Sequence, residues 1–186
     1  PTVLLATGSY ANNSQLVSKY HPEFFGMVTS AQPGSHGDGI YLARQCKRKL
    51  PSGTIITPHL KELEGFAEVS VIGHPEKLPQ IVSDLAADRG IIVVGKDAKT
   101  VVSNGQECYI NDTGNNGMAT GGSGDVLAGM TAGLLAQKMD SFEAAKLAVY
   151  LHGAAGDVMK EKKSSYSLLA TDLLEGISEL LSNLEA

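Results

Sequence analysis

Tryptophan is absent from this chain of 186 residues, and aromatic side chains make up only 5 % of it. The core must therefore be built mainly from leucine, isoleucine, valine and alanine. The longest apolar run, residues 126–136 (interrupted only by Thr131), is about half the length that a membrane span needs. Basic residues are also few, with 15 lysines and arginines against 20 acidic residues and a net charge of −5. These absences exclude a membrane span and do not favour a nucleic-acid partner.

Cysteine is equally sparse. Cys46 and Cys108 stand far apart in the sequence and form no Cys-x-x-Cys pair. Such spacing does not match a disulfide-stabilised scaffold or a zinc site, so we expect reduced thiols and no protein-bound structural metal. The first residues lack the pattern of basic and then apolar residues that marks a secretory signal. The sequence therefore predicts a soluble, cytoplasmic protein.

Apolar residues make up 42 % of the chain and charged residues 19 %, which is typical of a globular protein. The length suits one domain over residues 1–186. Segments with the pattern of short buried strands alternate with segments of helical periodicity. This alternation predicts an α/β fold in which helices cover both faces of a central sheet. Strands are expected at 3–7, 26–30, 54–59, 91–96, 100–103 and 107–111, and helices at 40–50, 60–69, 78–90, 125–137, 142–160 and 171–183.

The stretch TGGSGDVLAGM (120–130) places three glycines, a serine and an aspartate directly before a helical segment. No Lys-Ser or Lys-Thr follows the glycines, so the stretch is not a P-loop, and the third small residue of the dinucleotide-binding fingerprint is missing. Two interpretations remain. The stretch is either a sharp turn whose aspartate, Asp125, stabilises the helix start, or a loop whose backbone amides bind an anion.

The context of this stretch favours the anion site. A long loop rich in turn-forming residues, TGNNGMAT (113–120), precedes it, and such loops commonly serve a site. The helix that follows carries small residues, among them Gly129 and Gly133, which predict close packing against the sheet. His152 falls within an apolar helical spacing and is interpreted as a packing residue. Asp157 is interpreted as a helix-end residue rather than as a ligand.

The segments 111–137 and 144–158 resemble the ADP- or ATP-dependent NAD(P)H-hydrate dehydratases of the ribokinase-like superfamily. The segments TPHLKELE (57–64) and IIVVGKDAKTVV (91–102) are similar to two further elements of that family, in matching order. The resemblance implies a ribokinase-like three-layer α/β/α sandwich with a mostly parallel sheet. It also implies ADP or ATP as phosphate donor with Mg²⁺, hydrated NADH or NADPH as substrate, and a homo-oligomer.

The resemblance also assigns roles to individual residues. Asp125 corresponds to the base that activates the acceptor hydroxyl and would also contact the substrate. His59 and Gly34 correspond to substrate-binding positions, and Glu62 is a lesser candidate. The nucleotide-binding residues would be Lys96, Asp97, Ala98, Lys99, Thr100, Gly122, Ser123 and Gly124. Donors at the glycine-rich loop would stabilise charge on the transferred phosphate while one carboxylate takes the proton.

The sequence also departs from the family pattern. It lacks the early glycine-rich strand-turn-helix that binds the nicotinamide side, and it is shorter than we expect for the family. The loop Gln32-Pro33-Gly34 carries His36 where the family has a glycine. Two alternatives to the dehydratase therefore stay open: a ribokinase-like kinase acting on a vitamin precursor or sugar, and a nucleotide-binding module without catalysis. As a stand-alone domain, the chain resembles the ADP-using bacterial branch more closely.

Overall fold

The computed structural model describes residues 4–5, 15, 18 and 50–184. At its centre is a five-stranded sheet in the order β1-β2-β3-β4-β5. The strands are β1 (Leu4–Leu5), β2 (Ile55–Ile56), β3 (Ile92–Gly95), β4 (Val101–Ser103) and β5 (Cys108–Ile110). The first three pair in parallel, and β4 is antiparallel to both of its neighbours. The sheet is therefore mixed, with β4 alone running against the direction of the other strands.

Side chains of successive strand residues enter two separate cores, one on each face of the sheet. Ile55 and Val94 belong to one core, whereas Ile56 and Val93 belong to the other. This division follows from the two-residue period of a strand. Both faces are apolar because both are covered by helices, which explains why residues 91–94 form a continuous apolar run.

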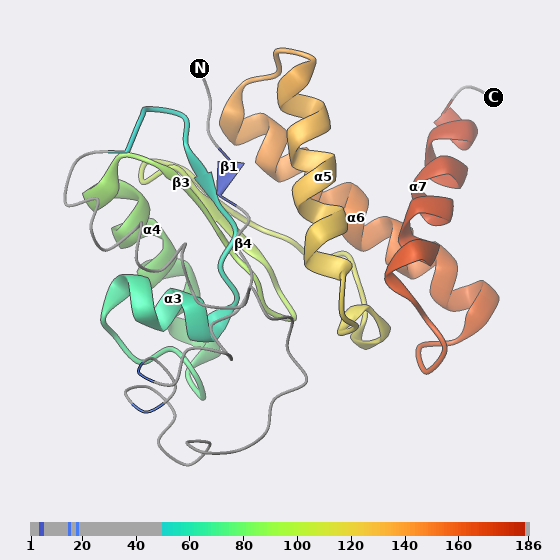
Figure 1. Ribbon diagram of the computed structural model, residues 1–186, viewed down its shortest axis with the longest axis horizontal. Coiled ribbons are helices and arrows are strands. Elements are labelled where there is room, and N and C mark those ends of the chain that lie inside the picture. Colours follow the sequence, from blue (N-terminus) through green and yellow to red (C-terminus); the bar gives the residue numbers. More distant parts are fainter. Residues whose placement is uncertain (1–3, 6–14, 16–17, 19–49, 185–186) are drawn as a thin grey trace.

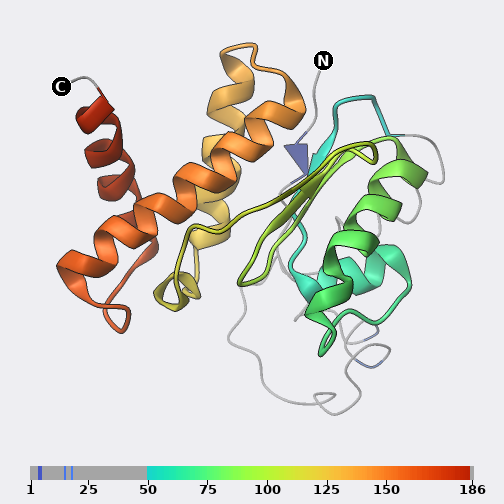
Figure 2. The ribbon, with the colours of Figure 1, turned by 180° about the vertical axis from the view of Figure 1, so that it is seen from behind.

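Helices α3 (Leu60–Ala67) and α4 (Leu78–Arg89) cover one face of the sheet, and α5 (Ser123–Ala136) and α6 (Ser141–Lys163) cover the other (Figure 1). The last helix, α7 (Ala170–Leu184), packs against α6 and α5, on their side away from the sheet (Figure 2). The predicted three-layer α/β/α arrangement is confirmed. Within the described residues, no helix is both long enough and apolar enough to cross a membrane.

Several local predictions are confirmed by their own residues. The turn Asn104-Gly105 joins β4 to β5, and Gly105 has a φ of 88°, which favours glycine. Helix α4 ends where Gly90 adopts a left-handed conformation. The strand expected at 26–30 and all but the last residue of the helix expected at 40–50 lie outside the described residues.

The predicted close packing of Gly129 and Gly133 against the sheet is wrong. A Cβ atom added to either glycine would meet nothing within 4 Å, because both lie on the exposed side of α5. The same helix packs inward through Leu127, Ala128 and Thr131. Small residues on one helix indicate close approach only on the face that meets a neighbour, and that face was not visible in the sequence.

Close helix approach occurs instead between α6 and α7. A Cβ added to Gly176 would lie 2.5 Å from the carbonyl oxygen of Ala155, which is backbone and cannot move aside cheaply. Gly176 therefore sets the distance at which α7 crosses α6.

Replacing Gly176 by alanine is expected to lower the free energy of unfolding by about 1–3 kcal/mol, because the new methyl group forces α7 away from α6. Replacing Gly133 by alanine is the matched control, since it adds the same methyl group in open space within a helix. This control is expected to stabilise by about 0.5–1 kcal/mol, the usual gain of alanine over glycine in a helix. Urea denaturation of the two variants measures both values, and equal effects would contradict the interpretation.

Candidate functional site

A cavity of about 860 Å³ opens where the carboxyl ends of β2 and β3 meet the start of α5. In sheets with parallel strands this edge is the usual place for a ligand. Its wall combines the two strand ends, the loop before α5, the first turn of α5 and the middle of α6. The lining residues are His59, Lys96, Asp97, Ala98, Thr100, Asn111, Thr113, Gly114, Asn115, Asn116, Met118, Ala119, Thr120, Ser123, Gly124, Leu127, Val149, His152 and Gly153.

His59 and Lys96 lie side by side because β2 and β3 continue their parallel pairing beyond the named strands. The two residues form a bridge, and the Lys96 amide donates to the carbonyl oxygen of Pro58 at 2.8 Å. Within residues 50–184 no carboxylate forms an ion pair with Lys96. The ammonium group is thus available to an anionic ligand at the wall of the cavity.

His59 also caps helix α3. Its Nδ1 accepts a hydrogen bond from the Glu62 amide at 3.2 Å, and the Glu62 carboxylate accepts one from the His59 amide at 3.0 Å. This reciprocal capping box fixes the position of the imidazole. Glu62, a lesser site candidate in the sequence, thereby has a structural role, and it does not line the cavity among the residues described.

The pKa of His59 is lowered from its ordinary value, first by burial and further by the charge of Lys96, although Glu62 acts in the opposite direction. A lowered pKa means that the imidazole is mostly neutral at neutral pH. Lys96 therefore supplies the positive side-chain charge at this strand edge.

The first turn of α5 presents backbone donors to the same space. Gly122, with a φ of 92°, occupies the N-cap position and offers no side chain to cap the helix. In the described part of the chain the Gly124 amide meets no backbone or side-chain acceptor. A Cβ added to Gly124 would lie 3.2 Å from the Lys96 ammonium nitrogen, so this glycine leaves room for the lysine. The helix start and Lys96 together favour an anion.

The loop between β5 and α5 is held against α6 by Asp157. The Asp157 carboxylate accepts hydrogen bonds from the Gly114 amide at 2.7 Å and from the Asn115 side chain at 2.9 Å. Nearby, the Thr113 hydroxyl donates to the Tyr150 carbonyl oxygen at 3.0 Å. Asp157 lies inside α6, so its interpretation as a helix-end residue is wrong. Its function in the fold is to fix a loop that forms much of the cavity wall.

Gly153 makes this attachment possible. A Cβ at this position would lie 2.2 Å from the Thr113 hydroxyl oxygen and 2.7 Å from the Thr113 carbonyl group. Only a residue without a side chain lets the loop lie directly on α6 here.

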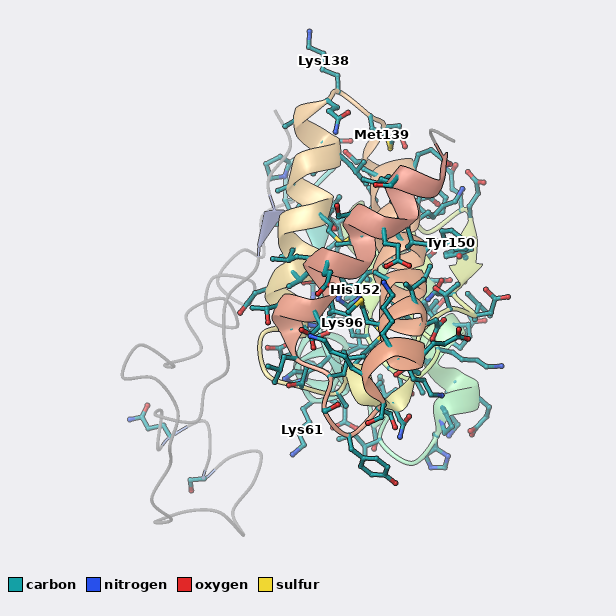
Figure 3. The ribbon with its side chains drawn as sticks, turned by 90° about the vertical axis from the view of Figure 1, so that its right-hand side faces the viewer. Lys61, Lys96, Lys138, Met139, Tyr150 and His152 are labelled. Atoms are coloured by element: carbon teal, nitrogen blue, oxygen red, sulfur yellow. The ribbon has the colours of Figure 1, made fainter. Side chains whose placement is uncertain are left out.

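His152 belongs to the cavity wall rather than to the packing interior that the sequence suggested. Its Nε2 lies 2.9 Å from the Ser123 carbonyl oxygen and 3.3 Å from the Ser123 hydroxyl oxygen. Figure 3 shows Lys96 and His152 in the interior of the molecule, behind the helices, and Tyr150 on the flank of α6. Burial lowers the pKa of His152, and the charge of Lys96 lowers it further, against the opposing effect of the Ser123 hydrogen bond.

The structure gathers most, but not all, of the site residues named from the sequence. Lys96, Asp97, Ala98, Thr100, Ser123 and Gly124, together with His59, line the cavity. Among the described residues, Lys99, Gly122 and Asp125 lie outside the lining, and Asp125 is exposed in the first turn of α5. Gly34 lies outside the described residues.

The sequence did not identify any individual residue of the loop 111–120 or of α6 as a site residue, although several of them line the cavity. The loop could be anticipated as a segment from its length and its turn-forming residues. Val149, His152 and Gly153 carry no such signal, because they follow the ordinary periodicity of a buried helix. Their contribution depends on how α6 crosses behind the loop.

Replacing Asp157 by asparagine is expected to loosen the loop, because the new amide nitrogen cannot accept the hydrogen bond that one carboxylate oxygen now accepts. The expected loss is about 0.5–1.5 kcal/mol of unfolding free energy, the usual net value of one hydrogen bond, because Asp157 and its two donors are only half-buried. In Asp157→Ala, which removes both acceptor oxygens, hydrogen exchange of the Gly114 amide should accelerate as well. An unchanged exchange rate at Gly114 in that variant would show that Asp157 does not hold the loop.

Acid is expected to destabilise the protein through the two histidines of the cavity wall, whose pKa values are lowered in the fold. An unfolded histidine takes up a proton near pH 6.5, whereas His59 and His152 resist protonation in the fold, so the unfolded state binds more protons as the pH falls below that value. Stability should therefore decrease from pH 7.5 to pH 5.5. Denaturant titrations at both pH values test this, and His152→Gln should show a smaller decrease than the wild type.

The amino-acid sequence is similar to that of a known protein family. A family model described as NAD(P)H-hydrate dehydratase matches residues 35–179. The chain is 41 % identical over 136 residues to the ADP-dependent (S)-NAD(P)H-hydrate dehydratase of Neisseria meningitidis, a match that covers 73 % of this chain and 43 % of that protein.

Two solved structures extend the comparison to the fold. The ADP/ATP-dependent NAD(P)H-hydrate dehydratase of Bacillus subtilis, co-crystallised with ATP and Mg²⁺, superimposes with a TM-score of 0.69 at 33 % identity, covering 74 % of this chain and 51 % of that one. A ribokinase-like superfamily protein of Enterococcus faecalis gives a TM-score of 0.69 at 26 % identity, covering 98 % and 63 %. The chain thus spans less than two thirds of each of these proteins. The match of the family model to residues 35–179, together with the similarity in sequence and fold, shows that the chain belongs to the NAD(P)H-hydrate dehydratase family.

Proposed function

We propose that this protein takes part in the nucleotide-dependent dehydration of hydrated NADH or NADPH, with ADP or ATP as the phosphate donor. The observation that carries the proposal is the cavity in which Lys96, the open start of α5 and the loop 111–120 converge, in a chain of this family. The relative from Neisseria meningitidis is named for the ADP-dependent reaction, and that from Bacillus subtilis was crystallised with ATP and Mg²⁺.

The charge of the cavity supports binding of the nucleotide phosphates at the helix start. The Gly124 amide, the Ser123 hydroxyl and the Lys96 ammonium group come from two elements but face one space. Phosphate oxygens accept from such donors, and the partial positive charge of the helix start adds to the attraction. Apolar residues of the same wall, namely Met118, Leu127 and Val149, suit the flat face of the base.

The strand-end segment 96–100 is proposed to lie along the nucleotide. Asp97, Ala98 and Thr100 line the cavity beside Lys96, whereas Lys99 is exposed outside the lining. Lys99 would contact the nucleotide only from the solvent side. Gly122 supports the site through its backbone conformation rather than through direct contact.

The residues present fit a Mg²⁺ ion that arrives with the nucleotide. Among the described residues no three acidic, histidine or cysteine side chains cluster closely enough to hold a metal by themselves. Mg²⁺ commonly keeps several water ligands and binds through substrate phosphates and one or two carboxylates. Asp97 is the carboxylate that the described cavity wall offers for this purpose. The ion would neutralise charge on the phosphates when bound.

Asp125 is proposed to be the base. It follows Ser123 and Gly124 in the first turn of α5 but is exposed outside the cavity lining, so a hydroxyl group approaching from solvent can reach it. The hydroxyl oxygen of the hydrated ring would attack the terminal phosphorus while Asp125 accepts the hydroxyl proton. The bond from that phosphorus to its bridging oxygen would break, releasing AMP from ADP or ADP from ATP. The carbon–oxygen bond of the phosphorylated ring would then break with release of inorganic phosphate, the neighbouring ring carbon would lose a proton to solvent, and the ring double bond would be restored.

Fewer of the proposed substrate contacts than of the proposed nucleotide contacts lie among the described residues. His59 is proposed to contact the substrate from the strand edge, where its neutral ring, whose Nδ1 accepts from the Glu62 amide, can donate a hydrogen bond through Nε2. Gly34, the other proposed contact, lies outside the described residues. A cytoplasmic location, a single domain and a homo-oligomeric assembly remain predictions from the sequence.

Replacing Asp125 by asparagine is expected to lower turnover by at least about 10²-fold, because the amide cannot accept the proton. The reaction is followed at 340 nm with hydrated NADH, Mg²⁺ and either ADP or ATP, since dehydration restores the absorbance of NADH. Nucleotide affinity should change little.

Asp88→Asn on α4 serves as the matched control, because Asp88 is exposed on a helix that does not line the cavity. Normal turnover by Asp125→Asn would refute its role as base. A stable phosphorylated product would indicate a small-molecule kinase instead, and nucleotide binding without any turnover would indicate a non-catalytic module.

A further inference from the structure

His152 of α6 and Ser123 at the start of α5 lie within hydrogen-bonding distance of each other. Ser123 is the first residue of α5, and only 7 % of it is exposed. His152 Nε2 approaches both the carbonyl oxygen of Ser123, at 2.9 Å, and its hydroxyl oxygen, at 3.3 Å. Both residues line the cavity.

These distances determine which ring nitrogen of His152 carries a proton. A carbonyl oxygen can only accept a hydrogen bond, so Nε2 must donate at 2.9 Å and must therefore be protonated. A protonated ring nitrogen has no lone pair in the ring plane. The Ser123 hydroxyl consequently cannot donate its proton to His152, and the pair is not the base-and-nucleophile arrangement of a hydrolase.

The hydroxyl proton of Ser123 is thereby left without an acceptor among residues 50–184. A serine in a helix often donates to the carbonyl group one turn earlier, but Ser123 makes no such bond within the described chain. A buried hydroxyl on a cavity wall with an undirected proton is a hydrogen-bond donor available to a ligand.

We infer that His152 is a positioning residue: by donating Nε2–H to the Ser123 carbonyl oxygen, it directs the Ser123 hydroxyl proton toward an anion bound at the start of α5. The inference rests on the proposed function, because the anion is taken to be a nucleotide phosphate. Three donors then face that anion, namely the Ser123 hydroxyl, the Gly124 amide and the Lys96 ammonium group. The hydrogen bond also ties the first turn of α5 to α6.

The charge state of His152 agrees with this arrangement. Burial and the nearby Lys96 charge lower the pKa of His152, so the ring is mostly neutral at neutral pH with Nδ1 unprotonated. The groups that act on it are Lys96 from the end of β3 and Ser123 from α5. A neutral donor can hold the Ser123 carbonyl without adding a second positive charge beside Lys96, which would be costly to bury.

The test measures the dissociation constants of Mg²⁺–ATP and Mg²⁺–ADP by isothermal titration calorimetry. His152→Phe fills the space of the ring but cannot donate, and it is expected to weaken binding by about three- to tenfold, the usual effect of one lost hydrogen bond. His152→Gln places an amide N–H near the position of Nε2 and should stay within about twofold of the wild type. Tyr150→Phe, on the exposed flank of the same helix, is the control and should bind as the wild type does.

A double mutant separates positioning from a general structural effect. Ser123→Ala should weaken binding about as much as His152→Phe, and the double variant should be hardly weaker than either single variant, because Ser123→Ala removes the hydroxyl donor and His152→Phe removes only its orientation. Melting temperatures identify any loss that merely follows unfolding. Additive effects, an unchanged dissociation constant in folded His152→Phe, or equal losses in His152→Phe and His152→Gln would overturn the inference.

Nitrogen NMR of the imidazole rings in the free protein gives a second, independent measurement. The His152 signals, assigned by their absence in His152→Gln, should show a protonated Nε2 and an unprotonated Nδ1 at pH 7.5. A proton on Nδ1 alone would overturn the inference even if nucleotide binds normally. If the wild type binds neither nucleotide, the proposed function fails, whereas this measurement still decides the state of the His152–Ser123 pair.

Discussion

The register in which β2 pairs with β3 determines both the core and the site. Ile55 lies opposite Ile92 and Ile56 opposite Val93, so each residue pair enters the same core, and the pairing continues to His59 and Lys96 at the edge. A slip of one residue would move every apolar side chain to the opposite face. The burial of two apolar cores therefore also fixes the neighbours at the mouth of the cavity, and the stability of the sheet and the geometry of the site have one cause.

Helix α6 provides the second fixed surface. One face of it carries Val149, His152, Gly153 and Asp157, which line the cavity or hold the loop and helix that line it. The loop 111–120 is rich in glycine and asparagine and has few apolar side chains of its own. It is held by hydrogen bonds to a helix that is itself packed between the sheet and α7, and by the packing of Met118. The loop thus forms a defined wall because a rigid element supports it.

The electrostatic character of the site follows from what is left unpaired. Lys96 has no acidic partner within residues 50–184, both cavity histidines have lowered pKa values, and the start of α5 has no side-chain cap. Each of these features would be unfavourable in a purely structural element. The ammonium group of Lys96 and the open start of α5 thereby make the site locally positive on a protein whose net charge is −5, while the two histidines stay mostly neutral. A small anion is attracted locally, although the chain as a whole would repel a polyanion.

The sequence by itself determined the local helices, strands and turns, and it pointed to most of the cavity-lining residues at the strand ends and at the start of α5. Periodicity, turn residues and glycine positions are local properties, so the hairpin at Asn104-Gly105, the end of α4 at Gly90 and the glycine-rich start of α5 could be predicted. Only the tertiary structure decided which helix faces meet and which residues share the cavity. Gly129 and Gly133 are exposed, whereas Gly153 lies against Thr113 and Gly176 lies against Ala155. His152 faces Ser123 although the two residues are 29 positions apart in the sequence. Such pairings depend on the crossing of distant segments, which no local pattern records.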